Sequence, residues 1–255
     1  MRKIMDKTTV VGVLLGLGGI LVGNAMEGGH LSNLMQLTAF LIVFAGTIGA
    51  MLVGSTEENV RTGMELLKWA FSSKKQISKK EVLDQVIAAA QIARNESVLS
   101  LEKQLHKYKI PFMKEVFKYA VDGLDSKVLQ ELGEEKIELE KRRLMGGAKI
   151  WTDAGGYAPT IGILGAVLGL IHVMSNLSDT SQLGAGIAVA FVATIYGVAS
   201  ANLVFLPLGN KIKQKVQEHT QSQYMILEGA VSIVLGQSSY VVEQKMRAFI
   251  ERTGE

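Results

Sequence analysis

The sequence predicts an all-α integral membrane protein with four transmembrane helices, a large helical cytoplasmic insert between helices 2 and 3, and a cytoplasmic C-terminal helix. Three observations lead to this fold class. The 255 residues are 48% hydrophobic and only 20% charged, which is too apolar for an ordinary soluble chain of this size. The apolar residues come in long blocks. The short loops between paired blocks contain no lysine or arginine.

The longest apolar region, residues 155–207, holds two arms with a polar break at residues 178–182. The arms read GGYAPTIGILGAVLGLIHVMSNL and LGAGIAVAFVATIYGVASANLVFLP, and neither contains Asp, Glu, Lys or Arg. Each arm is long enough to cross a bilayer core, which takes roughly 20 residues of helix. We therefore expect a hairpin of two transmembrane helices that packs against other helices and supplies no charge of its own.

Two further apolar runs, residues 8–23 and 34–53, are separated by a polar loop at residues 24–33. A short basic head, residues 1–7, precedes the first run, so a secretory signal peptide is one alternative. The first run is rich in glycine, however, and no clear A-x-A cleavage site follows it. We therefore favour a retained, rather short first transmembrane helix.

The insert, residues 54–150, is charged, rich in lysine and free of long apolar runs. Apolar side chains recur at helical spacing between residues 81 and 108, which predicts one amphipathic helix there. Ser78 followed by Glu81 suits the N-terminal cap of this helix. After a proline, residues 112–145 are expected to form one broken helix or two consecutive helices.

The positive charges predict the orientation. Every lysine and arginine lies in the head, in the insert or after residue 207. The positive-inside rule therefore places both termini and the insert in the cytoplasm, which agrees with an even number of spans. The expected segments are the head and first hairpin at 1–53, the cytoplasmic helical domain at 54–150, the second hairpin at 151–207, and the cytoplasmic helical tail at 208–255.

The residues exclude several kinds of chemistry. There is no cysteine, so disulfides, iron–sulfur clusters and thiolate metal sites are absent. The net charge of +3 gives no support to nucleic-acid binding. No nucleophile–base pair, phosphate loop or metal cluster is evident, so we expect neither an enzyme nor a bound cofactor. An ion carrier within hydrocarbon normally needs a carboxylate. Because the arms contain none, any such acid has to come from another chain.

Several residues in the second hairpin have both a structural and a functional interpretation. Pro159 suits a helix start as well as a functional kink, and the two are equally favoured. Pro207 is expected to end the fourth run. Thr194 can offer its hydroxyl to a pore, although a membrane threonine more often bonds back to its own helix. Gly165 and Gly169 are expected to let helices approach closely.

The insert offers one charged pair of interest, Arg94 and Glu102. They are eight positions apart, so on one helix they would point to nearly the same side. Taken alone, this spacing is typical of an ordinary solvated helix face.

These sequences resemble a known family. APTIGILGAVLGLIHVM and GIAVAFVATIYGVASANLVFLP are similar to the third and fourth membrane helices of flagellar stator subunits of the MotA and PomA type. The resemblance extends to MDKTTVVGVLLGLGGILVG, AFLIVFAGTIGAMLVG and IARNESVLSLE, and so covers nearly the whole chain.

The resemblance implies a fold, a location and partners. Chains of this family form a ring, a pentamer, in the bacterial inner membrane around a dimer of MotB-like helices. The MotB-like partner supplies a membrane aspartate that carries the ion, and its periplasmic domain grips peptidoglycan. Ion passage turns the ring, and the cytoplasmic domain pushes the rotor protein FliG.

Carried over by position, the family's ion-path prolines correspond to Pro159 and Pro207, and its polar threonine corresponds to Thr194. Sodium-type members have a second threonine where this chain has Ala166. The loss of that oxygen favours protons, with sodium as the alternative. The rotor-contacting pair corresponds to Arg94 and Glu102. The family's further acidic position falls near residues 134 and 135, without a clear register.

Two rival functions remain at this point. Energisers of outer-membrane transport of the ExbB and TolQ type build a similar ring, but they typically have three spans. A structural scaffold without ion flow is the second rival.

Overall fold

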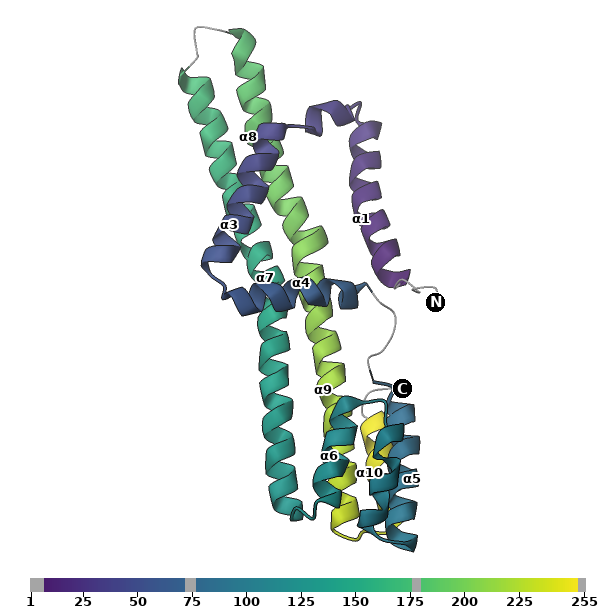
Figure 1. Ribbon diagram of the computed structural model, residues 1–255. Coiled ribbons are helices and arrows are strands. Elements are labelled where there is room, and N and C mark those ends of the chain that lie inside the picture. Colours follow the sequence, from purple (N-terminus) through teal and green to yellow (C-terminus); the bar gives the residue numbers. More distant parts are fainter. Residues whose placement is uncertain (1–6, 72–76, 176–179, 252–255) are drawn as a thin grey trace. The chain divides into compact units, whose positions relative to one another are not determined.

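The computed structural model describes residues 7–71, 77–175 and 180–251, and every regular element within these ranges is helical (Figure 1). The predicted all-α class is therefore confirmed. In chain order the elements are α1 (Lys7–Met26), η1 (Leu31–Leu34), α2 (Leu37–Phe40), η2 (Leu41–Ala45), α3 (Gly46–Val53), α4 (Glu57–Ala70), α5 (Lys79–Asn95), η3 (Val98–Lys107), α6 (Pro111–Val121), α7 (Ser126–Ser175), α8 (Thr180–Ser200), η4 (Ala201–Phe205), α9 (Leu206–Val234) and α10 (Ser239–Glu251).

Four helical stretches within the described ranges are long and apolar enough to cross a membrane. They are Thr8–Met26, Leu31–Val53, Ser126–Ser175 and Leu183–Val234. Each contains the described part of one of the four apolar runs expected from the sequence, and residues 176–179, with part of the polar break expected at 178–182, lie outside the described ranges. The last two stretches are longer than a membrane is thick, because polar helix continues from the apolar segments without a break.

The chain folds into two compact units. The first unit contains residues 7–71, 143–175 and 180–214, and the second contains residues 77–142 and 215–251. Helices α7 and α9 each contribute residues to both units. The four-segment division of the sequence remains a prediction.

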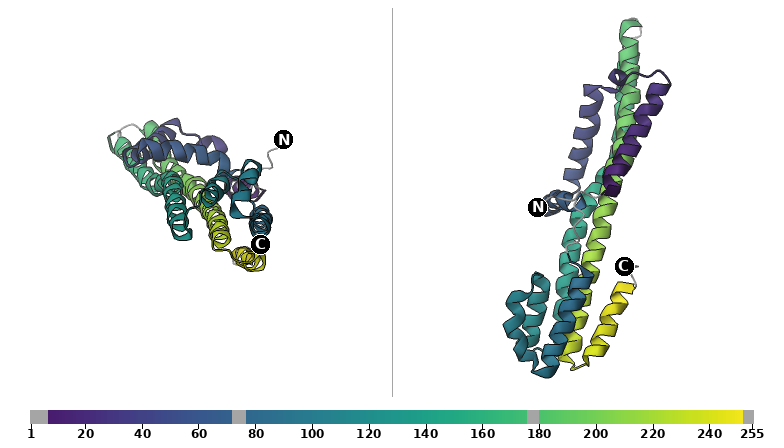
Figure 2. Two further views of the ribbon diagram at one scale, coloured as in Figure 1. Left: turned by 60° about the horizontal axis from the view of Figure 1, so that its bottom comes forward. Right: turned by 90° about the vertical axis from the view of Figure 1, so that its right-hand side faces the viewer.

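In the first unit, α4 lies crosswise to α7 and is seen nearly end-on in the right-hand view of Figure 2. Gly63 makes the crossing close: a Cβ added there would lie 2.7 Å from the carbonyl oxygen of Gly147. The indole Nε1 of Trp151 donates a hydrogen bond of 3.1 Å to the carbonyl oxygen of Gly63. Small residues and one anchoring tryptophan therefore join α4 to α7.

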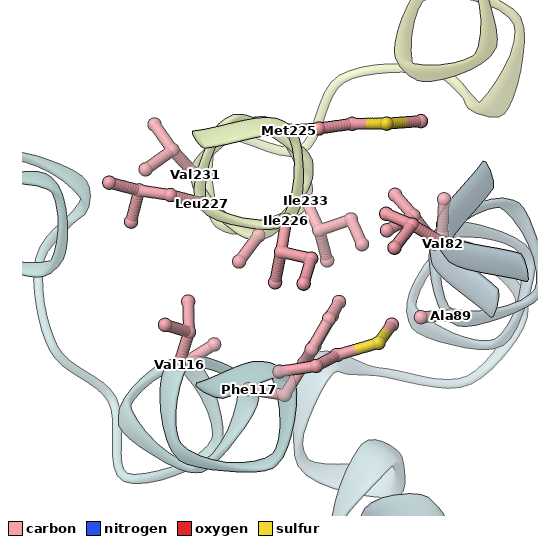
Figure 3. Packing of buried hydrophobic residues seen from close by; sticks show 14 of the residues in the cluster. Val82, Ala89, Val116, Phe117, Met225, Ile226, Leu227, Val231 and Ile233 are labelled. Atoms are coloured by element: carbon pink, nitrogen blue, oxygen red, sulfur yellow. The ribbon is translucent and has the colours of Figure 1, made fainter. Parts of the chain in front are cut away.

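In the second unit, α5, α6 and α10 surround the unit's part of α9 (Figures 1 and 2). Their buried side chains form one apolar core, and Figure 3 shows Val82 and Phe117 directed towards Ile226 on α9. All three of these side chains are fully buried. In this core, large apolar side chains from several helices pack together and exclude water.

Helix caps in the second unit follow the sequence signals. The Ser78 hydroxyl accepts a hydrogen bond of 3.4 Å from the Glu81 amide, which confirms the predicted cap. Between α6 and α7, Gly123 adopts a positive φ of 82°, which glycine tolerates without strain. The expected break within residues 112–145 therefore gives two helices rather than one.

One predicted helix is wrong. The segment from residue 81 to 108 is not a single amphipathic helix, because α5 ends at Asn95 and a 3₁₀ segment, η3, begins at Val98. Ser97 between them is fully extended, with φ −175° and ψ 166°. The apolar spacing continues across this break, so periodicity alone could not reveal it.

Both prolines of the second hairpin lie within helical runs. Pro159 is inside α7, which excludes the helix start among its two equally favoured interpretations. The expectation for Pro207 was wrong. Pro207 does not end the fourth run, because α9 continues from Leu206 to Val234. Proline cannot donate to the carbonyl four residues earlier. For Pro207 that residue is Leu203, which lies in the π-helical turn η4, where the ordinary bonding pattern is already altered.

Candidate functional site

The candidate site of the first unit is a close crossing of α7 and α8. A Cβ added at Gly162 would lie 2.8 Å from the carbonyl oxygen of Ala193, and one added at Gly197 would lie 2.5 Å from that of Ala158. At Gly169 the backbone nitrogen of Ala190 would be 2.9 Å away. The two backbones therefore touch over several turns, as helices do in membranes where small residues face each other.

Gly165 and Gly169 take part in this crossing, which confirms the predicted role in packing. A Cβ on Gly165 would lie 2.8 Å from the Cβ of Ala193 and 3.2 Å from Ile42. The second hairpin thus also contacts η2. Side chains larger than glycine would push the helices apart at these points.

Three of the expected ion-path residues come together at this crossing. Thr194 lies beside Gly162, since the Cα of Thr194 would be 3.5 Å from a Cβ added there. Gly162 is in turn about one helical turn from both Pro159 and Ala166 along α7. Pro159, Ala166 and Thr194 are all half-buried, so none is sealed in the core of the unit.

The polar chemistry of this crossing is weak. The Thr194 hydroxyl donates a hydrogen bond of 3.2 Å to the carbonyl oxygen of Ala190 in its own helix, which is the structural role expected of a membrane threonine. The hydroxyl oxygen keeps acceptor capacity for a further donor. Neither arm contains a carboxylate, so the Thr194 hydroxyl oxygen is the polar side-chain atom that this crossing can offer to another group.

Pro207 is placed differently from the other expected ion-path residues. It is exposed and lines a separate cavity with residues of α1 and the end of α4, including Gly12 and Phe71. Along the helical run it is 13 residues from Thr194, or about 20 Å at the α-helical rise. The structure therefore does not bring Pro207 into the group formed by Pro159, Ala166 and Thr194.

The charged pair of the second unit is not on one helix. Arg94 lies in the last turn of α5, whereas Glu102 lies in η3 beyond the extended Ser97. The eight-residue spacing therefore does not place them on one helical face, and that inference was wrong. Both side chains are exposed, as is each of Glu134 and Glu135 on α7.

Tyr196 has a role that the sequence did not reveal. Its hydroxyl donates to the carbonyl oxygen of Leu34 and accepts a hydrogen bond of 3.4 Å from the Gln36 amide. Its ring lies edge-on to Phe40, with centroids 6.5 Å apart. The tyrosine thus fastens the start of α2 to α8. The only sequence signal was a single phenol in an otherwise apolar helix.

In the second unit, one ion pair joins α6 to α7. The Lys136 ammonium donates a hydrogen bond to the Glu115 carboxylate, and the Tyr119 hydroxyl donates to the same carboxylate at 3.0 Å. The hydrogen bond from Lys136 is the main reason why the pKa of Glu115 lies below its usual value, and burial partly opposes it.

Comparisons with known proteins agree on one family. Residues 102–225 match the model of the MotA/TolQ/ExbB proton channel family, and residues 10–97 match the model described as Motility protein A N-terminal. The chain is 34% identical to Motility protein A of Bacillus subtilis over 246 residues, which are 96% of this chain and 91% of the relative.

Solved structures extend this similarity to the fold. A chain in the structure of C. jejuni MotAB superimposes with a TM-score of 0.90 at 30% identity and covers 96% of both chains. A chain of the flagellar MotAB stator complex from Bacillus subtilis superimposes with a TM-score of 0.86 at 34% identity and covers 94% of both chains.

Proposed function

Because the chain belongs to the MotA family of flagellar motor stator subunits, we propose that it forms a ring around a MotB-like partner and couples proton flow to rotation. The partner supplies the membrane aspartate, and the present chain supplies the wall along which that aspartate moves. The ring is a pentamer in this proposal, and it pushes the rotor protein FliG.

The observation that carries the proposal is a closely packed hairpin without an acid. At the α7–α8 crossing the backbone of Thr194 lies beside Gly162, between the levels of Pro159 and Ala166. The apolar arms contain no carboxylate, and a carboxylate at membrane depth is what proton carriers normally use. The second polypeptide in the MotAB relatives is the natural source of that group.

The free-energy scale supports such a cycle. Protonation of the partner's aspartate removes a penalty of about 2.5–3.5 kcal/mol for a charge facing apolar wall. The neutral side chain then fits a different neighbour in the ring, and release of the proton near Pro159 restores the charge. A membrane potential of 100 mV supplies about 2.3 kcal/mol per proton, which is enough to bias each step.

Protons are favoured over sodium by the residue at position 166, one helical turn along α7 from the glycine beside Thr194. A hard cation is held by several oxygen atoms, and Ala166 supplies none where sodium-type members have a threonine. Thr194 already donates its proton to Ala190, so one hydroxyl oxygen is all that this part of the wall adds. Sodium remains the alternative ion.

The proposed topology places the ring in the bacterial inner membrane with both termini in the cytoplasm. The distribution of lysine and arginine supports this orientation. It also exposes Arg94 and Glu102 to the cytoplasm, where the rotor protein is. Because they lie on either side of the break at Ser97, we propose that they contact the rotor as two separate charges on a bent segment.

An energiser of the ExbB and TolQ type is the second candidate, since the matched family includes both. The match of residues 10–97 to the Motility protein A N-terminal model supports the flagellar role. The extensive superposition on two MotAB chains does so as well.

Motility tests the proposal directly. Thr194→Val and Pro159→Leu are expected to insert normally into the membrane but to abolish swimming. Thr160→Val is the matched control, because that exposed hydroxyl also bonds back within its own helix, to the Tyr157 carbonyl oxygen at 2.8 Å. Normal swimming by the Thr194 or Pro159 variant would refute the assigned roles.

Swimming speed against external sodium, with and without a protonophore, tests the ion. We expect speed to be insensitive to sodium and abolished by the protonophore. Sodium-dependent swimming that survives the protonophore would show that the proton assignment is wrong.

A further inference from the structure

The first unit contains a cavity of 530 Å³ that the proposed ion path does not use. It lies between the first turns of α1, the end of α4 and the run from η4 into α9. Its wall is mostly apolar and includes Gly12, Phe71 and Leu203. The volume falls within the roughly 300–1,000 Å³ typical of small-molecule sites.

The cavity exists because α1 separates from the fourth run towards its own N-terminus. At Gly16 the two are in contact, since a Cβ there would lie 3.0 Å from a methyl group of Leu203. One turn earlier, at Gly12, a Cβ would meet nothing within 4 Å. The Gly16–Leu203 contact therefore closes one end, and the space widens beyond it.

A cation lies at the rim. Among the described residues that line the cavity, Lys211 is the charged one, and its ammonium donates a hydrogen bond to the Thr9 hydroxyl. Lys211 also follows the last apolar arm by four residues, so it lies where that run leaves the hydrocarbon. The cavity thus combines an apolar interior with a cation at the level of lipid headgroups.

We propose that this cavity binds an anionic phospholipid, with an acyl chain against Gly12 and Leu203 and the phosphate at Lys211. Basic pockets between transmembrane helices on the cytoplasmic side are typical sites for anionic headgroups. The inference uses the membrane location and orientation proposed above, but it is independent of the transported ion.

The size of the cavity favours a lipid chain over a helix from a second copy. A helix with its side chains is 10–12 Å wide with a pitch of 5.4 Å, so one turn fills roughly 400–600 Å³. The cavity would therefore hold about one turn. A single acyl chain, by contrast, is narrow enough to enter beside α1 and leave its headgroup at the rim.

Bound lipid in the purified complex is the test. The chain is purified with its MotB-like partner from membranes containing phosphatidylglycerol and phosphatidylethanolamine, and retained lipids are quantified by mass spectrometry. We expect phosphatidylglycerol to be enriched. Gly12→Phe, which places a ring in the open space, should abolish the enrichment. Lys211→Met should reduce it by about fivefold, the factor expected for one lysine near a membrane surface.

Matched controls keep the test specific. Gly19→Phe adds the same ring to α1 at a position outside the cavity, where a Cβ also meets nothing within 4 Å. Lys213→Met removes a charge two residues further along the same turn of α9, outside the lining. Both should retain phosphatidylglycerol as the unmodified chain does. If Gly12→Phe fails to assemble, Lys211→Met against Lys213→Met still decides the question.

Three results would overturn the proposal. One is equal retention of phosphatidylglycerol by the unmodified chain, Gly12→Phe and Lys211→Met. Another is competition by glycerol phosphate as effective as that of the intact lipid, which would indicate a free phosphate site. The third is cross-linking of Gly12→Cys to a neighbouring copy in the assembled ring, which would show that protein fills the cavity.

Discussion

The α7–α8 crossing of the first unit and the core of the second unit are held together in different ways. At the crossing, backbone meets backbone, and Gly162 and Gly197 have no room for a side chain. In the second unit, large side chains such as Phe117, Met225 and Ile226 fill the space between helices (Figure 3). The crossing depends on glycines, which lack a Cβ and let the backbones touch. The core of the second unit depends on large buried side chains.

In the topology proposed above, in which the first unit crosses the membrane and the second lies in the cytoplasm, the difference follows from the solvent of each region. In water, burial of apolar side chains drives association, and each large side chain contributes a few kcal/mol. In lipid the surroundings are as apolar as leucine, so close packing has to supply the attraction. The exposed surface agrees: Leu14 and Leu15 on α1 are 67% and 72% exposed, which suits lipid contact.

The largest expected effect comes from deleting an aromatic ring at each location. Phe117→Ala should lower the free energy of unfolding by about 3–5 kcal/mol, because the ring is fully buried and its loss leaves a cavity. Phe191→Ala makes the same change on α8, where the residue is 69% exposed, and should lower the free energy of unfolding by far less. Denaturant unfolding of the detergent-solubilised protein measures both. An equal loss of unfolding free energy in the two variants would contradict the proposed contrast between the regions.

The converse change should affect the crossing. Gly162→Val places a branched side chain where even a Cβ would be 2.8 Å from the Ala193 oxygen, so we expect a loss of about 1–3 kcal/mol from overpacking. Gly184→Val is the control, because a Cβ there meets nothing within 4 Å. The same unfolding assay compares them. If both glycines tolerated valine equally, close backbone contact would not be what holds α7 to α8.

Much of the helical content was predictable from sequence, because long apolar runs and helix caps are local signals. The described parts of the four apolar runs are mainly helical, and Ser78 caps α5 as expected. The close approach at Gly165 and Gly169 followed from their spacing. These predictions depend on residues close together in the chain and on the length of apolar runs, and both can be read directly from the sequence.

The failures all involved tertiary context. Pro207 remains within a helical run because the η4 turn can accommodate a lost backbone bond, which a local rule for proline ignores. For Pro159, the sequence alone could not choose between a helix start and a kink, and only the fold excludes the start. The break at Ser97 interrupts an apolar pattern that continues on either side. Tyr196 reaches a backbone 160 residues away, a contact that no spacing rule contains.

A smaller effect is expected at a helix start of the second unit. Ser78→Ala removes the hydroxyl that accepts from the Glu81 amide, and should cost about 1 kcal/mol of unfolding free energy. Ser97→Ala is the matched control, since Ser97 precedes η3 but its side chain makes no capping bond. Thermal unfolding in detergent compares the pair. A loss at Ser97 as large as at Ser78 would argue against capping as a separate source of stability in this unit.

The smallest expected effect is electrostatic and depends on pH. The hydrogen bond from Lys136 lowers the pKa of Glu115 in the folded protein, so the pair stabilises the fold above the ordinary glutamate pKa of 4.5 and loses that contribution as pH falls through the lowered value. Both side chains are 41% exposed, and solvent screening limits the contribution to about 0.2–1 kcal/mol. Glu115→Gln should therefore be less stable than the unmodified protein near neutral pH, and the difference should vanish in acid.

Glu134→Gln is the control for this titration, because that exposed carboxylate accepts a hydrogen bond from Gln130 rather than from a cation. Unfolding curves of the full chain in detergent, recorded from about pH 3 to 7, would show the two variants diverging only at the upper end. The second unit would then hold a salt-sensitive contribution that the acid-free α7–α8 crossing cannot have. If the lower stability of Glu115→Gln persisted unchanged in acid, the Glu115 side chain would act by packing. An electrostatic contribution would then not distinguish the second unit from the α7–α8 crossing.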